Sequence, residues 1–130
     1  MAPLVPELHS HWEDESKYYM KFVLVQGPSL FTEMLSREFK PLSVKATKNL
    51  MRKLATIVKE FHQAGIVHLD LKLEHLKLVG KKSFGKLDLE KCDVAVIDFG
   101  LCDFITTINE RESEVYCGSM DYVAPGKELN

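Results

Sequence analysis

Hydrophobic and polar positions near the start of the chain follow a strand-like pattern. Residues 8–13 and 18–25 predict two short strands around a polar turn. The second segment, from Tyr18 to Val25, is rich in aromatic and β-branched residues, as half-buried strands are. Gly27-Pro28 predicts its end. A short helix is expected next, from Ser29 to about Arg37.

The longest predicted helix follows, between Ser43 as its N-cap and Gly65 at the C′ position. Its apolar residues recur at steps of one and three, which keeps them on one face of a 3.6-residue helix. We therefore expect this face to pack in the core. Its members are Leu50, Met51, Leu54, Ile57, Val58 and Phe61.

Beyond this helix the pattern predicts two more short strands, residues 76–79 and 94–98. The segment between them, residues 80–91, is rich in Lys and Gly and is interpreted as a solvated hairpin loop. Residues 101–123 have little periodicity. The order of strand, strand, helix, helix, hairpin and long loop indicates an α+β arrangement.

Composition limits the function classes. The chain has 130 residues, enough for one domain, and a net charge of −2. That charge offers no basic field for nucleic acid or an anionic membrane surface, so neither is expected as a partner. No apolar stretch approaches the ~20 residues of a membrane-spanning helix.

The cysteines and the N-terminus bear on the compartment. The chain has three cysteines, Cys92, Cys102 and Cys117, without C-x-x-C spacing. An odd number without that spacing argues against a disulfide framework or a zinc site, and favours reduced thiols. The first residues lack the basic and apolar regions of a secretory signal. We expect a cytoplasmic or nuclear protein that is not secreted.

Two motifs carry candidate chemistry. The segment from His68 to His75 reads H-L-D-L-K-L-E-H, and Asp98-Phe99-Gly100 follows the apolar run of residues 94–97. Together with the closing segment from Cys117 to Gly126, they resemble the eukaryotic protein kinase family. Its signatures include H-R-D-L-K-x-x-N, D-F-G and A-P-E.

The resemblance covers nearly the whole chain, yet only part of a kinase domain. It implies that residues 1–130 form a partial protein-kinase-like fold. Residues 1–28 would supply the last strands of the N-lobe and the hinge. Residues 29–130 would supply the first part of the mainly helical C-lobe, with the catalytic loop and the activation segment.

The resemblance also implies catalytic roles. Asp70 would accept the hydrogen bond of the substrate hydroxyl and orient it for attack on the phosphorus. Lys72 would stabilise the charge of the γ-phosphoryl group, and a Lys here resembles the serine/threonine-directed branch. Ser119, in the activation segment, would bridge to both residues through its hydroxyl.

ATP and Mg²⁺ are the cofactors that the family uses. By resemblance, Asp98 would hold Mg²⁺ as a hard oxygen ligand. The hinge backbone and the catalytic loop would contact the nucleotide through Val23, Leu24, Val25 and Glu74.

Several positions depart from the family pattern. His75 stands where the family has a metal-binding Asn, and imidazole suits zinc or copper better than magnesium. A neutral substitution tolerated by an active enzyme remains the alternative. Lys77 aligns with the apolar floor under adenine, and Gly126 replaces the Glu of A-P-E. No G-x-G-x-x-G loop precedes the hinge.

Three functional hypotheses follow. The first is a serine/threonine protein kinase that acts on a protein substrate, although we expect no catalysis from these residues in isolation. The second is a pseudokinase-like regulator that binds a partner kinase, a substrate or a scaffold. The third is a degenerate fragment without a stable product.

Overall fold

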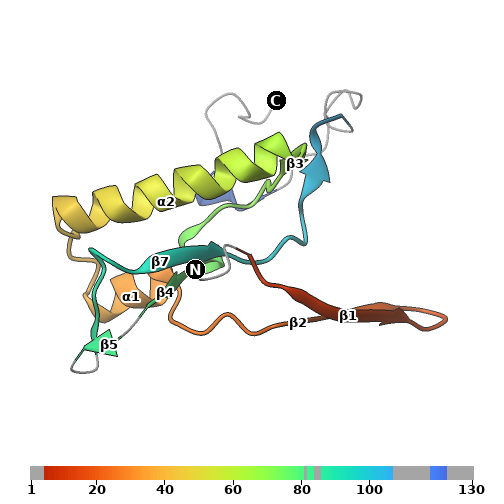
Figure 1. Cartoon of the computed structure of the whole chain (residues 1–130), viewed down its shortest axis with the longest axis horizontal. Helices are drawn as coiled ribbons and strands as arrows, with labels where there is room; N and C mark the ends of the chain where they lie inside the picture. Colours follow the sequence, from red (N-terminus) through yellow and green to blue (C-terminus); the bar gives the residue numbers. More distant parts are fainter. Residues whose placement is uncertain (1–4, 81, 84–85, 107–117, 123–130) are drawn as a thin grey trace.

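In the described chain two short strands come first, then two helices and then further short strands (Figure 1). This is the order that the sequence predicts, with short strands added that it does not predict. The computed structural model describes residues 5–80, 82–83, 86–106 and 118–122. The expectations for Cys117 and for the A-P-G segment at residues 124–126 lie outside these ranges.

The strands are β1 (Leu8–Glu13), β2 (Tyr18–Phe22), β3 (Ile66–Val67), β4 (Leu76–Val79), β5 (Lys82–Ser83), β6 (Lys86–Leu87), β7 (Asp93–Val96) and β8 (Asp103–Phe104). The helices are α1 (Leu30–Ser36) and α2 (Val44–Gln63), with short 3₁₀ turns η1 (Leu73–His75) and η2 (Met120–Tyr122). Within the described residues the strands form antiparallel pairs only, β1 with β2, β3 with β8, β4 with β7 and β5 with β6.

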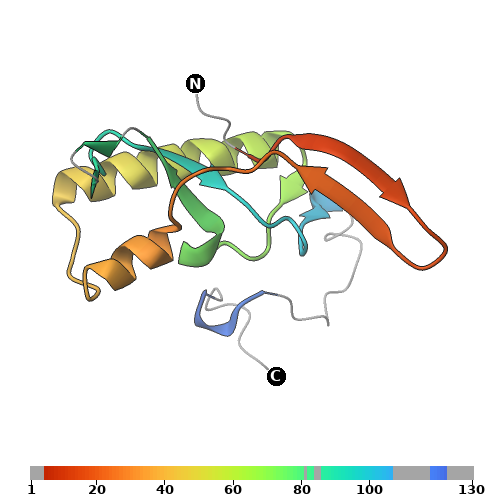
Figure 2. The ribbon, with the colours of Figure 1, turned by 90° about the horizontal axis from the view of Figure 1, so that it is seen from below.

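The β1–β2 hairpin extends away from the rest of the described chain (Figures 1 and 2). Asp14 holds its turn, because one carboxylate oxygen accepts hydrogen bonds from the amides of Ser16 and Lys17. Strand β2 ends at Phe22, three residues earlier than predicted. Beyond Phe22 the amide of Val23 still donates to the carbonyl of Glu7 at 2.8 Å, and residues 24–25 continue past the paired segment.

Helix α2 begins and ends where the sequence predicts. The Ser43 hydroxyl accepts a hydrogen bond from the amide of Ala46, which satisfies one of the unpaired donors of the first turn. The helix stops at Gln63, and Gly65 adopts a φ of +75°, the left-handed conformation expected at the C′ position.

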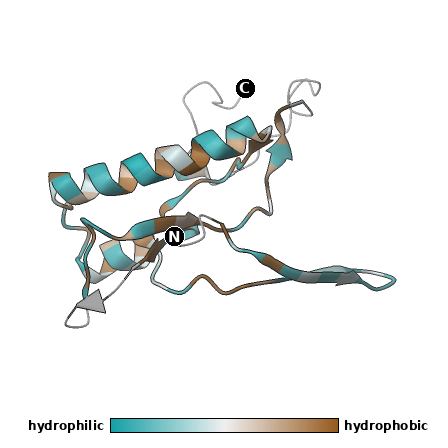
Figure 3. Ribbon diagram, in the orientation of Figure 1, coloured by the Kyte–Doolittle hydropathy of each residue, from teal (hydrophilic) through white to brown (hydrophobic). Residues whose placement is uncertain are grey.

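One face of α2 is buried, as the periodicity indicates, although the buried stripe is narrower than predicted. Figure 3 shows hydrophilic and hydrophobic bands alternating along the helix. Leu50 and Ile57 are buried, and Leu54 and Phe61 pack beside them. Met51 is 56% exposed, contrary to the prediction, because it lies about 100° around the helix from Leu50.

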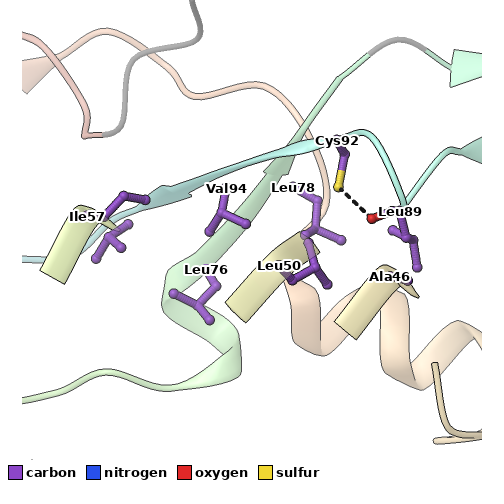
Figure 4. Packing of buried hydrophobic residues seen from close by; sticks show 9 residues of the cluster. Ala46, Leu50, Ile57, Leu76, Leu78, Leu89, Cys92 and Val94 are labelled. Atoms are coloured by element: carbon purple, nitrogen blue, oxygen red, sulfur yellow. Dashed lines mark hydrogen bonds between the residues drawn. The ribbon is translucent and has the colours of Figure 1, made fainter. Parts of the chain in front are cut away.

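The core lies between α2 and the β4–β7 pair (Figure 4). Alternate residues of the two strands point into it, whereas Ala95 of β7 is buried on the opposite face. The segment before β7 also contributes, because Leu89 is only 7% exposed. The predicted solvated hairpin loop over residues 80–91 is therefore confirmed as a hairpin by the β5–β6 pair but is wrong in the burial of Leu89. The buried residues contributed by this part of the chain are Leu76, Leu78, Leu89, Cys92, Val94 and Val96.

The β3–β8 pair is too short for sequence patterning to detect. Ile66 lies opposite Phe104, and the amide of Ile105 donates to the carbonyl of Gly65. The pair joins the end of α2 to the segment that follows Asp98-Phe99-Gly100. Among the described residues, a helix with the length and hydropathy of a membrane span is not found.

The packing against α2 generates a stability prediction. Ile57→Ala should lower the free energy of unfolding by about 2–5 kcal/mol, because Ile57 is fully buried and its truncation leaves a cavity. Urea denaturation measures this change. Met51→Ala, an exposed position on the same helix, is the matched control and should change stability by no more than about 0.5 kcal/mol. Equal losses for the two variants would contradict the described packing.

Candidate functional site

The loop from His68 to Lys72 is anchored by a buried histidine. The amide of Asp70 donates to Nδ1 of His68 at 3.3 Å, so the ring proton is on Nε2, which donates to the carbonyl of Ile97 at 3.2 Å. Burial lowers the pKa of His68, which favours this neutral form. His68 thereby ties the loop to the residue that precedes Asp98.

Asp70, Lys72 and Ser119 form one hydrogen-bonded group. One carboxylate oxygen of Asp70 accepts from the amide of Ser119 at 2.8 Å, and the other lies 3.1 Å from Lys72 Nζ. Lys72 Nζ also donates to the Ser119 hydroxyl at 2.9 Å. The sequence places these three residues in two motifs almost 50 positions apart, and the fold brings them into contact.

Hydrogen bonds keep the Asp70 carboxylate ionised. Burial, the largest influence, raises its pKa, but the hydrogen bonds from Ser119 and Lys72 together outweigh burial and leave the pKa below its ordinary value. An ionised carboxylate is a hydrogen-bond acceptor only, which suits it to receive the proton of a hydroxyl group.

Close packing against glycine fixes the position of Ser119. Gly118 has a φ of +108°, and a Cβ there would lie 2.6 Å from the carbonyl oxygen of Leu69. Leu69 itself has a φ of +64°, an uncommon conformation for a residue with a Cβ. The sequence motif alone does not indicate this strain. Such a backbone conformation persists because the packing around the loop determines it.

Asp98 and His75 lie side by side next to this group. Asp98 has a φ of +64°, and one carboxylate oxygen accepts from the amide of Gly100 at 3.1 Å. Its other oxygen lies 3.3 Å from Nε2 of His75. His75 is buried, and its Nδ1 lies 2.9 Å from the carbonyl oxygen of Asp70.

Aromatic packing supports Asp98 from behind. The ring of Phe99 packs against those of His68 and Phe61, at centroid distances of 5.0 Å and 5.4 Å, and the latter two rings lie 6.4 Å apart. Phe61 belongs to α2, so the Asp98-Phe99-Gly100 motif packs against the longest helix through the ring of Phe99.

An apolar pocket of about 700 Å³ lies between the hairpin and Asp98. The predicted hinge residues line it, and so does Lys77, as the alignment of the motif indicated. In the described part of the chain, the amides of Leu24 and Val25 have no hydrogen-bond partner, which leaves them available to a ligand. The lining residues are Pro6, Met20, Phe22, Val23, Leu24, Val25, Lys77, Ile97, Asp98, Phe99, Gly100 and Cys102.

The predicted site residues divide into two groups. Asp70, Lys72 and Ser119 meet, and His75 joins them to Asp98. Glu74 is exposed on η1 and does not line the pocket, so its nucleotide contact remains a prediction. Sequence reasoning missed Pro6 and Cys102 in the lining, and no pattern around them could have indicated it.

The donor set fits the family's cofactors only in part. The pocket and its free hinge amides suit a planar heterocycle. The Asp98 carboxylate suits Mg²⁺, but the imidazole of His75 does not, since Mg²⁺ demands oxygen ligands. Within the described residues there is also no group of three or more His, Cys, Asp or Glu side chains placed to hold an ion.

The close approach at Gly118 yields a second prediction. Gly118→Ala should break the hydrogen bond from the Ser119 amide to Asp70, because the new Cβ requires the backbone to move. Gly65→Ala is the matched control, since Gly65 also has a positive φ but has open space at its Cβ position. Amide hydrogen exchange at Ser119 should accelerate in the first variant alone. Equal exchange in the two variants would contradict the geometry.

The lowered pKa of Asp70 yields a third prediction. A carboxyl group with a depressed pKa contributes stability above its ordinary value, 3.8, and loses it as the pH falls through the folded-state pKa. The free-energy difference between the wild type and Asp70→Asn should therefore change most below about pH 4, and little above about pH 5. Asp14 and Glu90 also have lowered pKa values, but both proteins contain them, so their effects cancel.

Comparison with known proteins extends the motif resemblance to nearly the full chain. Residues 2–127 match the protein kinase domain. Probable serine/threonine-protein kinase 2 of Plasmodium falciparum is 30% identical over 125 residues, 96% of this chain and 22% of that protein. Calcium/calmodulin-dependent serine/threonine-protein kinase 1 of Oryza sativa is 34% identical over 119 residues, 92% of this chain and 18% of that protein.

The human hormonally up-regulated neu tumor-associated kinase is 30% identical over 124 residues, 95% of this chain and 16% of that protein. The chain thus spans about a fifth of the length of the curated relatives it matches. Because residues 2–127 match the kinase domain and carry its motifs, the chain belongs to the protein kinase family. Its helices and strands form part of a kinase-domain α+β fold.

Proposed function

We propose that this chain supplies the catalytic loop and part of the nucleotide pocket of a kinase that transfers the γ-phosphoryl group of ATP to Ser or Thr of a protein substrate. The grouping of Asp70, Lys72 and Ser119 carries the proposal. In it, an ionised acceptor lies next to a cation, which is the combination that phosphoryl transfer to a hydroxyl requires.

Each member of this group has a distinct part in the reaction. Asp70 accepts the hydrogen bond of the Ser or Thr hydroxyl, whose oxygen bonds to the γ-phosphorus while the bond to the ADP oxygen breaks. The hydroxyl proton passes to the carboxylate and then to solvent. Lys72 stabilises the negative charge on the transferred group, and Ser119 holds Lys72 and Asp70 together.

The pocket supports nucleotide binding with reduced affinity. Adenine fits between the hinge residues 23–25 and Ile97, where the free amides offer hydrogen bonds. Lys77 also lines the pocket, at the position beneath the base. Its ammonium group must extend to solvent when adenine binds, and this requirement lowers the affinity. ATP is the nucleotide proposed. No step of this mechanism is assigned to Mg²⁺, because the imidazole of His75 beside Asp98 does not suit that ion.

Two features favour a second function, that of a pseudokinase-like regulator that binds a partner kinase or substrate. The first is His75 at the position of the family's metal-binding Asn. The second is the apolar surface of the hairpin and the hinge, where Tyr18 is 84% exposed and Leu24 is 80% exposed. Large exposed apolar side chains are typical of binding surfaces.

The domain division and the location of the protein remain proposals. The hairpin extends away from the α2 core, which supports residues 1–28 as the end of one lobe and residues 29–130 as the start of the other. A protein substrate or a partner kinase, met in the cytoplasm or nucleus, is consistent with the near-neutral charge and the thiol content.

A chimeric kinase domain tests the function. Residues 2–127 replace the matching segment of the rice kinase, so that the remaining parts of the domain come from an active relative. We expect phosphorylation of Ser and Thr peptides but not of Tyr peptides. Asp70→Asn should lower kcat by about 10²–10⁴-fold, because the acceptor for the hydroxyl proton is lost.

Two further variants of the chimera complete this test. Asp88→Asn, in the turn before β7 and remote from the site, is the matched control and should keep full activity. His75→Asn should raise activity in Mg²⁺ if position 75 limits catalysis. A folded chimera that is inactive with either residue at position 75 would instead favour the non-catalytic regulator.

A further inference from the structure

Lys77 is a partly buried cation without a partner in the described chain. Of the lysines whose exposure the structure describes, those that are partly buried are Lys53, Lys72 and Lys77. Lys53 Nζ pairs with Asp93, and Lys72 Nζ lies 3.1 Å from a carboxylate oxygen of Asp70. Among the described residues, none forms a hydrogen bond or an ion pair with the ammonium group of Lys77. Burial removes part of the hydration of this charge, so an anion beside it would be stabilising.

The fold determines where this cation lies. Leu76 and Leu78 point into the core, so Lys77 between them lies on the other face of β4. The backbone of Lys77 forms an isolated bridge with Ser29, and in the β4–β7 pair it lies opposite Ala95. Lys77 therefore lines the apolar pocket from a strand that is paired on both sides.

The charge that is left without a partner in the pocket is positive. Lys77 and Asp98 are the only charged residues in its lining. One carboxylate oxygen of Asp98 accepts from the amide of Gly100, and the other lies 3.3 Å from Nε2 of His75. Asp98 thus has partners within the described chain, whereas Lys77 has none. Because the other lining residues are uncharged and mostly apolar, a ligand's negative charge would be attracted to Lys77 more strongly than in water.

We propose that this pocket binds a planar aromatic carboxylate, whose ring fills the apolar space and whose negative group pairs with Lys77. The pocket volume of about 700 Å³ is within the range of sites for small organic ligands. The inference goes beyond the proposed function, because the ligand is not a nucleotide and phosphoryl transfer is not involved. It concerns the same pocket, so the bound acid excludes adenine.

The part played by Lys77 differs between this ligand and adenine. Adenine is uncharged, so its binding leaves the ammonium group without a counter-ion. A carboxylate accepts a hydrogen bond from the ammonium group, and such a charge-assisted bond is about twice as strong as a neutral one. The lysine that lowers the affinity for adenine therefore raises the affinity for an aromatic acid.

The apolar walls limit which anions the pocket retains. A small hydrophilic anion gains the pairing with Lys77 but buries little apolar surface, and the loss of its hydration offsets the pairing. An aromatic acid also buries its ring against apolar side chains, among them Phe22, Leu24 and Ile97. Both contributions are therefore required for binding.

Titration of the nucleotide-free 130-residue chain with 2-naphthoate and 2-naphthamide tests the inference. The two ligands share one ring system and differ in charge near neutral pH. Isothermal titration calorimetry measures the Kd of each. We expect the wild type to bind 2-naphthoate at least about tenfold more tightly than 2-naphthamide, because only the carboxylate forms a charge-assisted bond with Lys77.

Three variants assign the preference to Lys77. Lys77→Met removes the charge and keeps an unbranched side chain, so it should weaken 2-naphthoate binding by at least about tenfold and leave 2-naphthamide binding unweakened. Its Tm should be at least that of the wild type, since the lost cation has no partner in the described chain. Lys77→Arg keeps the charge and should keep the preference. Lys48→Met, at an exposed position on α2, is the matched control and should bind both ligands as the wild type does.

Two results would overturn the inference. One is equal affinity of the wild type for the two ligands. The other is a preference for 2-naphthoate that survives Lys77→Met, since the carboxylate would then be held elsewhere. Neither measurement uses a nucleotide, so failure of this binding site and failure of the proposed kinase activity are separately observable.

Discussion

The register of β4 against β7 is the constraint on which the site depends. Leu76 lies opposite Val96, and the amide of Ile97 extends the ladder by donating to the carbonyl of His75. Position 75 is therefore aligned with the residue just before Asp98. A shift of one residue would turn the buried side chains outward, so packing against α2 enforces the alignment that builds the site.

Backbone strain in the site is tolerated because of this packing. Leu69 and Asp98 both adopt positive φ values, which residues with a Cβ rarely do. Such conformations persist only when the surroundings determine them. Here the surroundings are the buried ring of His68, the ring of Phe99 and the close approach of Gly118, so the reactive groups are positioned by parts of the chain that do no chemistry themselves.

Sequence patterning was sufficient for the elements with strong local signals. Helix α2 was predicted because its cap residue and periodic apolar face act locally, whereas the exposure of Met51 depends on how wide its partner surface is. The β3–β8 pair and the burial of Leu89 depend on distant contacts, so no local pattern indicates them. The motifs identified the reactive residues, but the contact between His75 and Asp98 follows only from strand register.

The hairpin that forms one wall of the pocket has no buried residue in either strand. A segment held by so few apolar contacts opens at a low free-energy cost and behaves as a separate cooperative unit. A ligand that closes the pocket must therefore order this wall, and the lost conformational entropy subtracts from its affinity. A protein that packs against the hairpin and removes that entropy beforehand would act as a positive effector of ligand binding, without touching the ligand.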